Sequence, residues 1–444
     1  MIPPGRILSF YGDDFSGSTD VMEVLAINGL ETVLFLDLSD EARLAQFQHC
    51  RAVGIAGKSR SQSPEWMTEH LPRIFGTLRR LGAPFCHYKV CSTFDSAPHV
   101  GSIGRAIEIG QELFRAPYVP VVVGAPALRR YCVFGNLFAT VDGMPYRLDR
   151  HPTMSRHPLT PMTESDLRRH LAKQTSKRSA LMDILALESA DSAERLQELL
   201  SEKPDILLFD VLDEPSLGEV GRLLWTLRAE PQAFVVGSSG IEYALATYLR
   251  SAGELPPPAE FPSAGSVDRL VAISGSCSPV TESQIRWAME HGFAAVGLDV
   301  AKLAVSDGVG ELGMDVVQKA LRELQAGRSV VLYTALGPHG TNLVPSDRRD
   351  SVFHQRLGES LGTLLRALVQ QAGIRRALIC GGDTSAHAGS QLGIYALTTR
   401  KPLAPGSPMC VAYSDDEHFD GLEIVFKGGQ VGSEDFFGLV QKGG

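Results

Sequence analysis

The sequence has few features of a secreted, membrane-spanning or disulfide-bonded protein. Its seven cysteines are scattered from Cys50 to Cys410 without a Cys-x-x-Cys pair, and an odd, scattered set favours reduced thiols. No apolar run approaches the roughly 20 residues that span a bilayer, and the first residues lack the charged-then-apolar layout of a signal peptide. We therefore expect a cytoplasmic protein whose cysteines are mostly buried and inert.

An excess of basic residues is also missing. The formal net charge is -9, whereas nucleic acids and membrane surfaces attract clustered Lys and Arg. We expect neither as a partner, and a small anionic ligand needs only a local basic pocket. With 444 residues, of which 44% are hydrophobic and 21% charged, the chain suits two globular domains better than one.

The chain repeats one pattern: an apolar, β-rich run, a turn of Gly, Ser and Asp, and then a helical segment. This pattern predicts an α/β protein with two domains, each built on a mainly parallel sheet with flanking helices, and an active site in the interdomain cleft. The proline-rich segment 255–265 is the predicted linker. It separates a first domain over residues 1–254 from a second domain over residues 266–444. The predicted strands are Arg6–Tyr11, Thr32–Leu36, Ala52–Ala56, Val119–Val123, Ile206–Phe209, Ala233–Val236, Leu270–Ser274, Ala294–Leu298, Ser329–Tyr333 and Ala377–Cys380.

The first motif, Gly12-Asp13-Asp14-Phe15-Ser16-Gly17-Ser18-Thr19-Asp20, lies at the carboxyl end of the strand Arg6–Tyr11 and runs into a helix predicted over Thr19–Asn28. Open α/β sheets bind ligands at such ends. One of the two carboxylates could act as general base on a substrate hydroxyl, while Ser16 hydrogen-bonds the ligand. Alternatively, the Asp and Ser residues only cap the helix. The motif alone supports both interpretations equally.

Three further segments of the first half could bind an anion. Lys89 precedes a run of hydroxyls and Asp95, so its ammonium could pair with the carboxylate of a polyol acid. Lys58-Ser59-Arg60-Ser61 is a comparable cationic turn. A basic region follows from Arg129-Arg130-Tyr131 to the segment 150–158, whose prolines and lack of nearby Cys disfavour zinc. For the first two segments, a helix cap or a solvated loop is the simpler alternative.

Small-residue turns follow several strands. Gly237-Ser238-Ser239-Gly240 could make a serine hydrolase only with a partnered His and Asp, which the sequence does not place. In the second half, the glycine turns Ser274–Thr281 and Gly381–Ser385 follow predicted strands, and amides at a helix start bind phosphate. Lys427–Gly432 adds a third glycine turn, beside a lysine. None matches a P-loop or a dinucleotide fingerprint. Three such turns in one domain nevertheless favour a nucleotide site.

Taken in order, these motifs resemble the four-carbon acid sugar kinase family over nearly the whole chain, including its branch that acts on 3-oxo-isoapionate. The resemblance implies ATP-dependent phosphorylation of a terminal hydroxyl of a short-chain sugar acid such as 3-oxo-tetronate, threonate, erythronate or 3-oxo-isoapionate. It also implies that residues 1–254 form a sugar-acid-binding domain and residues 266–444 a nucleotide-binding domain. By the same resemblance, Asp14, Arg60 and the 89–92 turn contact the acid, and Ser276, Gly382 and residues 428–431 contact ATP. Ser16 stands where many relatives carry Thr, and the turn after Lys427 reads Gly-Gly-Gln where relatives often have Ser and Asn.

These arguments give one set of candidate residues. The catalytic candidates are Asp14, chosen as the base, and Asp13. Substrate-binding candidates are Ser16, Arg60, Lys89, Val90, Cys91, Ser92, Thr93, Asp95, Arg150, His157, Ser238 and Ser239. Nucleotide-binding candidates are Ser276, Ser278, Gly381, Gly382, Asp383, Thr384, Gly428, Gly429, Gln430 and Val431.

The expected cofactors are ATP and Mg²⁺, because phosphoryl transfer depends on positioning and charge neutralisation. No residue is assigned as a metal ligand, and a homodimer is compatible with the sequence. The rival hypotheses are a non-catalytic sensor that binds a sugar acid and a nucleotide, and a serine hydrolase.

Overall fold

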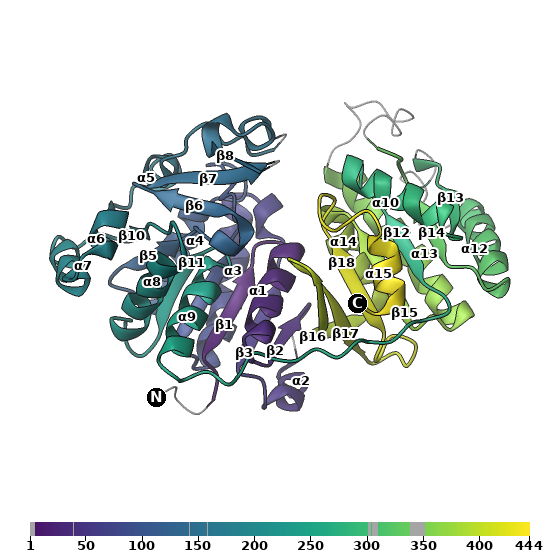
Figure 1. The fold of residues 1–444 in the computed structure, drawn as a ribbon, viewed down its shortest axis with the longest axis horizontal. Coiled ribbons are helices and arrows are strands. Elements are labelled where there is room, and N and C mark those ends of the chain that lie inside the picture. The colour runs from purple at the N-terminus through teal and green to yellow at the C-terminus, as the bar shows by residue number, and fades with distance from the viewer. Residues whose placement is uncertain are drawn as a thin grey trace. The chain divides into compact units, whose positions relative to one another are not determined.

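A computed structural model describes residues 5–38, 40–141, 143–157, 159–300, 303, 310–337 and 351–444. The chain divides into two compact units (Figure 1). The first unit comprises residues 1–32 and 45–259, and the second comprises residues 33–44 and 260–444. The segment 33–44 therefore groups with the C-terminal half, which the sequence did not suggest.

The first unit contains a parallel sheet in the order β3-β1-β4-β11-β5-β10-β9. Gly12 is in register with Lys89, and Lys89 with Gly237, so three neighbouring strands end at the same level. The strands are β1 (Leu8–Gly12), β3 (Ala52–Ala56), β4 (Phe85–Lys89), β5 (Val119–Val122), β9 (Ser179–Met182), β10 (Ile206–Phe209) and β11 (Ala233–Gly237).

Helices cover both faces of this sheet, which explains why its central strands are apolar on both sides. Figure 1 shows α1, α8 and α9 on the viewer's side and α3 and α4 behind. The helix predicted over Thr19–Asn28 begins four residues earlier, because Asp14 caps it. The helices are α1 (Phe15–Ile27), α3 (Pro64–Arg80), α4 (Ile103–Phe114), α5 (Leu167–Leu171), α6 (Ile184–Glu188), α7 (Ser192–Ser201), α8 (Glu214–Thr226) and α9 (Gly240–Ser251).

A small antiparallel sheet follows β5 and was not predicted. It consists of β6 (Arg130–Val133), β7 (Asn136–Val141) and β8 (Met144–Arg147). Bridges from Arg130 to Ala125 and from Cys132 to Val211 attach it just beyond the carboxyl ends of β5 and β10. The basic region of the sequence therefore lies on the side of the unit where the central strands end.

The second unit has its own sheet, in the order β13-β14-β12-β15-β18-β17-β16-β2. The first five strands are parallel, and the last three alternate in direction. The strands are β2 (Thr32–Phe35), β12 (Val271–Ser274), β13 (Ala294–Gly297), β14 (Val330–Tyr333), β15 (Arg376–Cys380), β16 (Ile394–Ala404), β17 (Ser407–Ser414) and β18 (Glu423–Lys427).

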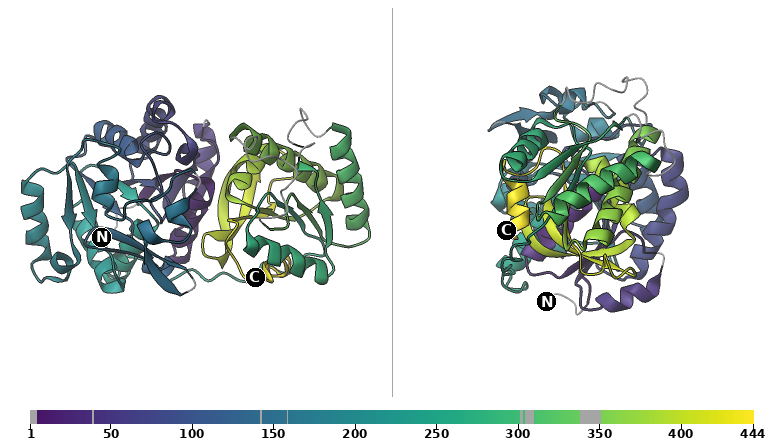
Figure 2. Two further views of the ribbon diagram at one scale, coloured as in Figure 1. Left: turned by 90° about the horizontal axis from the view of Figure 1, so that it is seen from above. Right: turned by 90° about the vertical axis from the view of Figure 1, so that its right-hand side faces the viewer.

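Helices flank this sheet as well, and Figure 2 shows them on both sides of the strands. The helix α10 packs on α15, while α13 packs on both α12 and α14. These helices are α2 (Glu41–Leu44), α10 (Pro279–Glu290), α12 (Gly310–Gln325), α13 (Ser351–Ala372), α14 (Gly382–Gly389) and α15 (Phe436–Lys442). Among the described helices, none is long and apolar enough to cross a membrane.

Candidate functional site

The candidate acid site of the first unit is built on the carboxyl ends of β1, β4 and β11. The turn after β1 is tied to its neighbours by backbone hydrogen bonds, from Asp13 N–H to the Lys89 carbonyl (2.9 Å) and from Arg60 N–H to the Asp13 carbonyl (3.0 Å). A Cβ at Gly12 would overlap the Ser18 hydroxyl, so only glycine fits there. The motif around Asp13, the cationic turn and the lysine segment thus come together.

Arg60 holds both carboxylates of the first motif. Its guanidinium donates to Asp13 at 2.7 and 3.2 Å and to Asp14 at 2.9 Å through each of two nitrogens. Asp14 also accepts the Gly17 N–H at 2.8 Å and so caps α1. The two interpretations of this motif are therefore compatible, since the same side chain caps the helix and faces a cation.

The two aspartates differ in exposure. The Asp13 side chain is 4% exposed and that of Asp14 is 26% exposed. Burial raises the pKa of Asp13 to about 6, although the charge of Arg60 opposes the rise. Asp14 is thus the carboxylate that a substrate hydroxyl can reach more readily.

Lys89 is buried beside the start of α1. Its Nζ lies 3.4 Å from a carboxylate oxygen of Asp20, the last residue of the first motif, to which no role was assigned. Burial opposes the charged form, yet Asp20, Asp14 and Asp13 together raise the pKa of Lys89. A Cβ at Gly17 would come within 3.0 Å of this ammonium, so glycine allows the lysine to approach the helix terminus.

A chain of hydrogen bonds joins four more candidates. Thr93 donates to Asp95 at 2.6 Å, so the Cys91 thiol, 2.9 Å from the Thr93 hydroxyl, must be the donor in that contact. Thr160 lies 3.5 Å from the other Asp95 oxygen, and its N–H donates to His157 Nδ1 at 3.1 Å. Thr160 was missed because no motif contains it. Burial raises the pKa of Cys91 to about 11, which keeps its thiol protonated.

The remaining candidates of this unit have different surroundings. The Ser16 hydroxyl oxygen is buried and has no partner within the described residues, whereas Ser92 is half-buried. The Val90 N–H bonds the Gly237 carbonyl at 2.7 Å. Arg150 is exposed, and among the described residues no hydrogen bond or ion pair links it to the network of Cys91, Thr93, Asp95 and His157.

The serine turn after β11 does not form a hydrolase site. The Ser238 hydroxyl donates to the Val123 carbonyl at 2.7 Å and accepts the Gly240 N–H at 2.9 Å, and Ser239 is buried. The buried His87 bonds Glu242 at 2.6 Å and faces the Gly237 carbonyl at 3.1 Å. Both ring nitrogens of His87 thus contact groups other than Ser238, which argues against a serine nucleophile.

In the second unit, the three glycine turns lie together at the carboxyl ends of β12, β15 and β18. Backbone bonds link them in sequence, from Gly275 N–H to the Cys380 carbonyl (3.1 Å) and from Gly381 N–H to the Lys427 carbonyl (2.8 Å). A Cβ at Gly275 would overlap the Thr384 hydroxyl, and one at Gly429 would lie 2.7 Å from Ser276 Oγ. The turns are in direct contact with one another.

Two helices begin at these turns. Ser278 caps α10 by accepting the Val280 N–H at 3.2 Å. Gly381 precedes α14 with φ of 117°, a conformation that favours glycine. Helix starts concentrate partial positive charge and free amides, so two of them at one sheet edge suit phosphate groups. The side chain of Asp383 lies outside the described residues.

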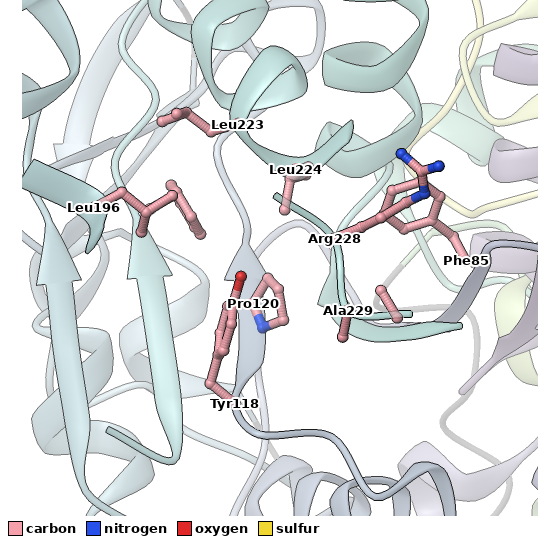
Figure 3. A pocket seen from close by; sticks show the side chains of 10 residues that line it. Phe85, Tyr118, Pro120, Leu196, Leu223, Leu224, Arg228 and Ala229 are labelled. Atoms are coloured by element: carbon pink, nitrogen blue, oxygen red, sulfur yellow. The ribbon is translucent and has the colours of Figure 1, made fainter. Parts of the chain in front are cut away.

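A small cavity in the first unit lies elsewhere (Figure 3). It is lined by Phe85 and Ala233, the first residues of β4 and β11, and so lies at the opposite end of those strands. Its volume is about 10 Å³, which is enough for about one water. This cavity is too small and too remote from the candidate residues to hold the acid.

Comparisons with known proteins agree with this arrangement. Residues 8–245 match the model of a sugar-binding N-terminal domain, and residues 271–437 match that of a nucleotide-binding C-terminal domain. The chain is therefore a two-domain protein of the class that pairs a sugar-binding with a nucleotide-binding domain.

Curated relatives narrow this class to kinases. The chain is 47% identical to the 3-oxo-isoapionate kinase of Paraburkholderia graminis, over 99% of this chain and 95% of that protein. It is 28% identical to the 3-oxo-tetronate kinase of Cupriavidus necator, over 99% and 98%. The chain belongs to the four-carbon acid sugar kinase family and is a sugar-acid kinase, as its motifs predicted.

A solved structure shows the same fold. The crystal structure of a Haemophilus influenzae protein from a family of unknown function aligns with a TM-score of 0.73 at 24% identity, covering 98% of this chain and 99% of that one. The predicted α/β fold with two domains is thus confirmed.

Proposed function

We propose that this chain transfers the γ-phosphate of ATP to a hydroxyl of 3-oxo-isoapionate, in the cytoplasm. The observation that carries the choice of acid is the 47% identity to a 3-oxo-isoapionate kinase along both chains, against 26–28% for 3-oxo-tetronate kinases. Residues of the first unit bind the acid, and the glycine turns of the second unit bind ATP.

Asp14 is the proposed general base. Its carboxylate is the more exposed of the pair, and Arg60 together with the Gly17 amide holds it in one orientation. A base fixed in this way takes the proton from the attacking hydroxyl as the phosphoryl group arrives. Asp13, which is more deeply buried, positions Arg60.

The charges around the base limit where the acid's own carboxylate can bind. Arg60 and Lys89 face four carboxylates, those of Asp13, Asp14, Asp20 and Asp95. Arg60 makes four hydrogen bonds to Asp13 and Asp14, whereas the Lys89–Asp20 pair is loose at 3.4 Å. Lys89 is therefore the cation that can exchange its partner for the substrate carboxylate.

Mg²⁺ accompanies ATP in this proposal. Within the described residues, no group of three or more His, Cys, Asp and Glu side chains could hold a metal ion. In kinases, Mg²⁺ is bound mainly by the phosphates and water and needs only one or two protein carboxylates. It would neutralise charge on the transferring group.

The test is a panel of sugar acids in a coupled assay of ADP release, with mass spectrometry of the product. We expect acid-dependent ADP release, highest kcat/KM with 3-oxo-isoapionate, and a product heavier by one phosphoryl group. Higher kcat/KM with 3-oxo-tetronate would overturn the choice of acid. Binding of an acid without acid-dependent ADP release would favour the sensor, and turnover without nucleotide would favour a hydrolase.

A further inference from the structure

Lys427, the last residue of β18, is a buried cation without a carboxylate partner in the described part of the chain. It is 0% exposed, and its ammonium donates to the carbonyls of Gly428 (2.9 Å) and Val431 (3.1 Å) and to the Thr281 hydroxyl (3.2 Å). Burial lowers its pKa. A charge buried against neutral acceptors alone is costly, so its position calls for an explanation.

The partners of Lys427 are the carbonyls of the loop that follows it. Two uncharged side chains of α10 bind the same loop from the same side. Thr281 donates to the Gly429 carbonyl at 2.8 Å, and Gln284 donates to the carbonyls of Val431 (3.0 Å) and Gly432 (3.1 Å). The carbonyls of residues 428, 429, 431 and 432 are thus all turned toward the protein.

The orientation of these carbonyls fixes that of the amides. In a planar trans peptide, the carbonyl of one residue and the N–H of the next point in opposite directions. The amides of Gly429, Gln430 and Gly432 therefore face away from Lys427, and no hydrogen bond within the described residues uses them. A Cβ at Gly429 would meet Ser276 Oγ and Ser278 Cβ, so the loop adjoins the start of α10.

We propose that Lys427 is a positioning residue for ATP: by holding the loop carbonyls inward, it presents the amides of Gly429, Gln430 and Gly432 to the phosphates. Successive free amides form an anion-binding concavity, and the α10 terminus adjoins this one. The lysine itself touches no phosphate. This inference rests on the proposed use of ATP and adds which part of the nucleotide the loop binds.

The experiment compares Lys427→Met with Lys442→Met in the full-length protein. The control removes an exposed lysine of the same unit, at the end of α15. For each variant, calorimetry measures the Kd of ATP and of ADP. Steady-state kinetics measure KM for ATP, KM for the acid, and the constant for inhibition of the reaction by adenosine. We expect Lys427→Met to weaken the binding of ATP and of ADP about tenfold or more, because the hydrogen bonds of one charged group are lost.

Adenosine separates positioning from general damage. Because adenosine has no phosphate, its inhibition constant should change less than about twofold in Lys427→Met, and KM for the acid should stay constant. Unaltered ATP affinity, or an equal loss for adenosine and ATP, would overturn the proposal. If Lys427→Met does not fold, Thr281→Val must show the same selective loss of affinity for ATP, with a smaller change in Kd. Wild-type protein that binds no ATP would refute the proposed function instead.

Discussion

Replacing Asp14 with Asn tests the proposed base with little change in shape. Asn is as good an N-cap as Asp, so the contact with the Gly17 N–H should survive. The amide nitrogen, however, would face Arg60 Nη1 at the position where Oδ2 now accepts a hydrogen bond at 2.9 Å. One charge-assisted hydrogen bond is lost, which costs about 1.5–3 kcal/mol when buried and less at this partly exposed site.

The net loss of stability should be about 1 kcal/mol, because Asp14 is partly exposed and removing one of four clustered carboxylates relieves repulsion. Such a loss lowers the melting temperature of a unit of this size by about 2–4 °C. Turnover should fall much further, by roughly 10²–10⁴, since a proton acceptor is gone. The affinity for ATP should not change.

The assay is acid-dependent ADP release at saturating acid and ATP, with calorimetric unfolding of the same samples. Asp13→Asn is the matched comparison, because that side chain also binds Arg60 but is more deeply buried. Near-normal turnover of Asp14→Asn would refute its role as base. An inactive Asp13→Asn beside an active Asp14→Asn would exchange the roles of the two aspartates.

Three further predictions concern the same site. Lys89→Met should raise KM for the acid about tenfold or more and leave KM for ATP unchanged. Adding Asp20→Asn to this variant should restore the melting temperature but not the affinity for the acid. Recovery of both would exclude Lys89 from binding the acid. Since the pKa of Asp13 is raised to about 6, its protonation stabilises the fold fully below about pH 4, and that contribution is lost as pH rises through 6. The unfolding temperature of the wild type, measured relative to that of Asp13→Asn, should therefore increase when the pH is lowered from 7.5 to 5. A constant difference between the two unfolding temperatures would contradict the raised pKa. Gly17→Ala would place a Cβ 2.6 Å from an Asp14 oxygen and 3.0 Å from Lys89 Nζ, so the affinity for the acid and the melting temperature should both fall. The control Gly76→Ala in α3, where a Cβ would have no neighbour nearer than 4.0 Å, should be neutral or stabilise the protein by up to about 1 kcal/mol. Equal effects of the two substitutions would refute this account.

Much of the fold could be predicted because strands buried on both faces are continuous apolar runs. Ile206–Phe209 matches its prediction, and Ala233–Val236 and Ala377–Cys380 are each one residue short. The small sheet from Arg130 to Arg147 was missed because its strands are half-exposed and mix polar with apolar residues. Their positions depend on tertiary bridges rather than on a local pattern.

The candidate site shows the same limit. Predicted strand ends followed by Gly, Ser and Asp located Asp13 and two of the glycine turns, because parallel strands bring their carboxyl ends to one edge. Lys89 was found from the hydroxyls and the carboxylate that follow it. Partners that come from elsewhere in the chain could not be found in this way. Asp20 ends the first motif but lies within a helix, and it was given no role because its pairing with Lys89 depends on the fold. Thr160 is in an irregular segment and belongs to no motif.

The pairing of β2 with β16 has a consequence for the synthesis and dissection of this protein. Val33 and Leu34 pair with Thr398 and Leu397, so one edge of the second sheet is made more than 350 residues before its partner. On the ribosome this strand cannot pair with β16 until nearly the whole chain has emerged. A cut within 255–265 would likewise yield two fragments that the pairing of β2 with β16 still joins, so they should remain associated until denatured.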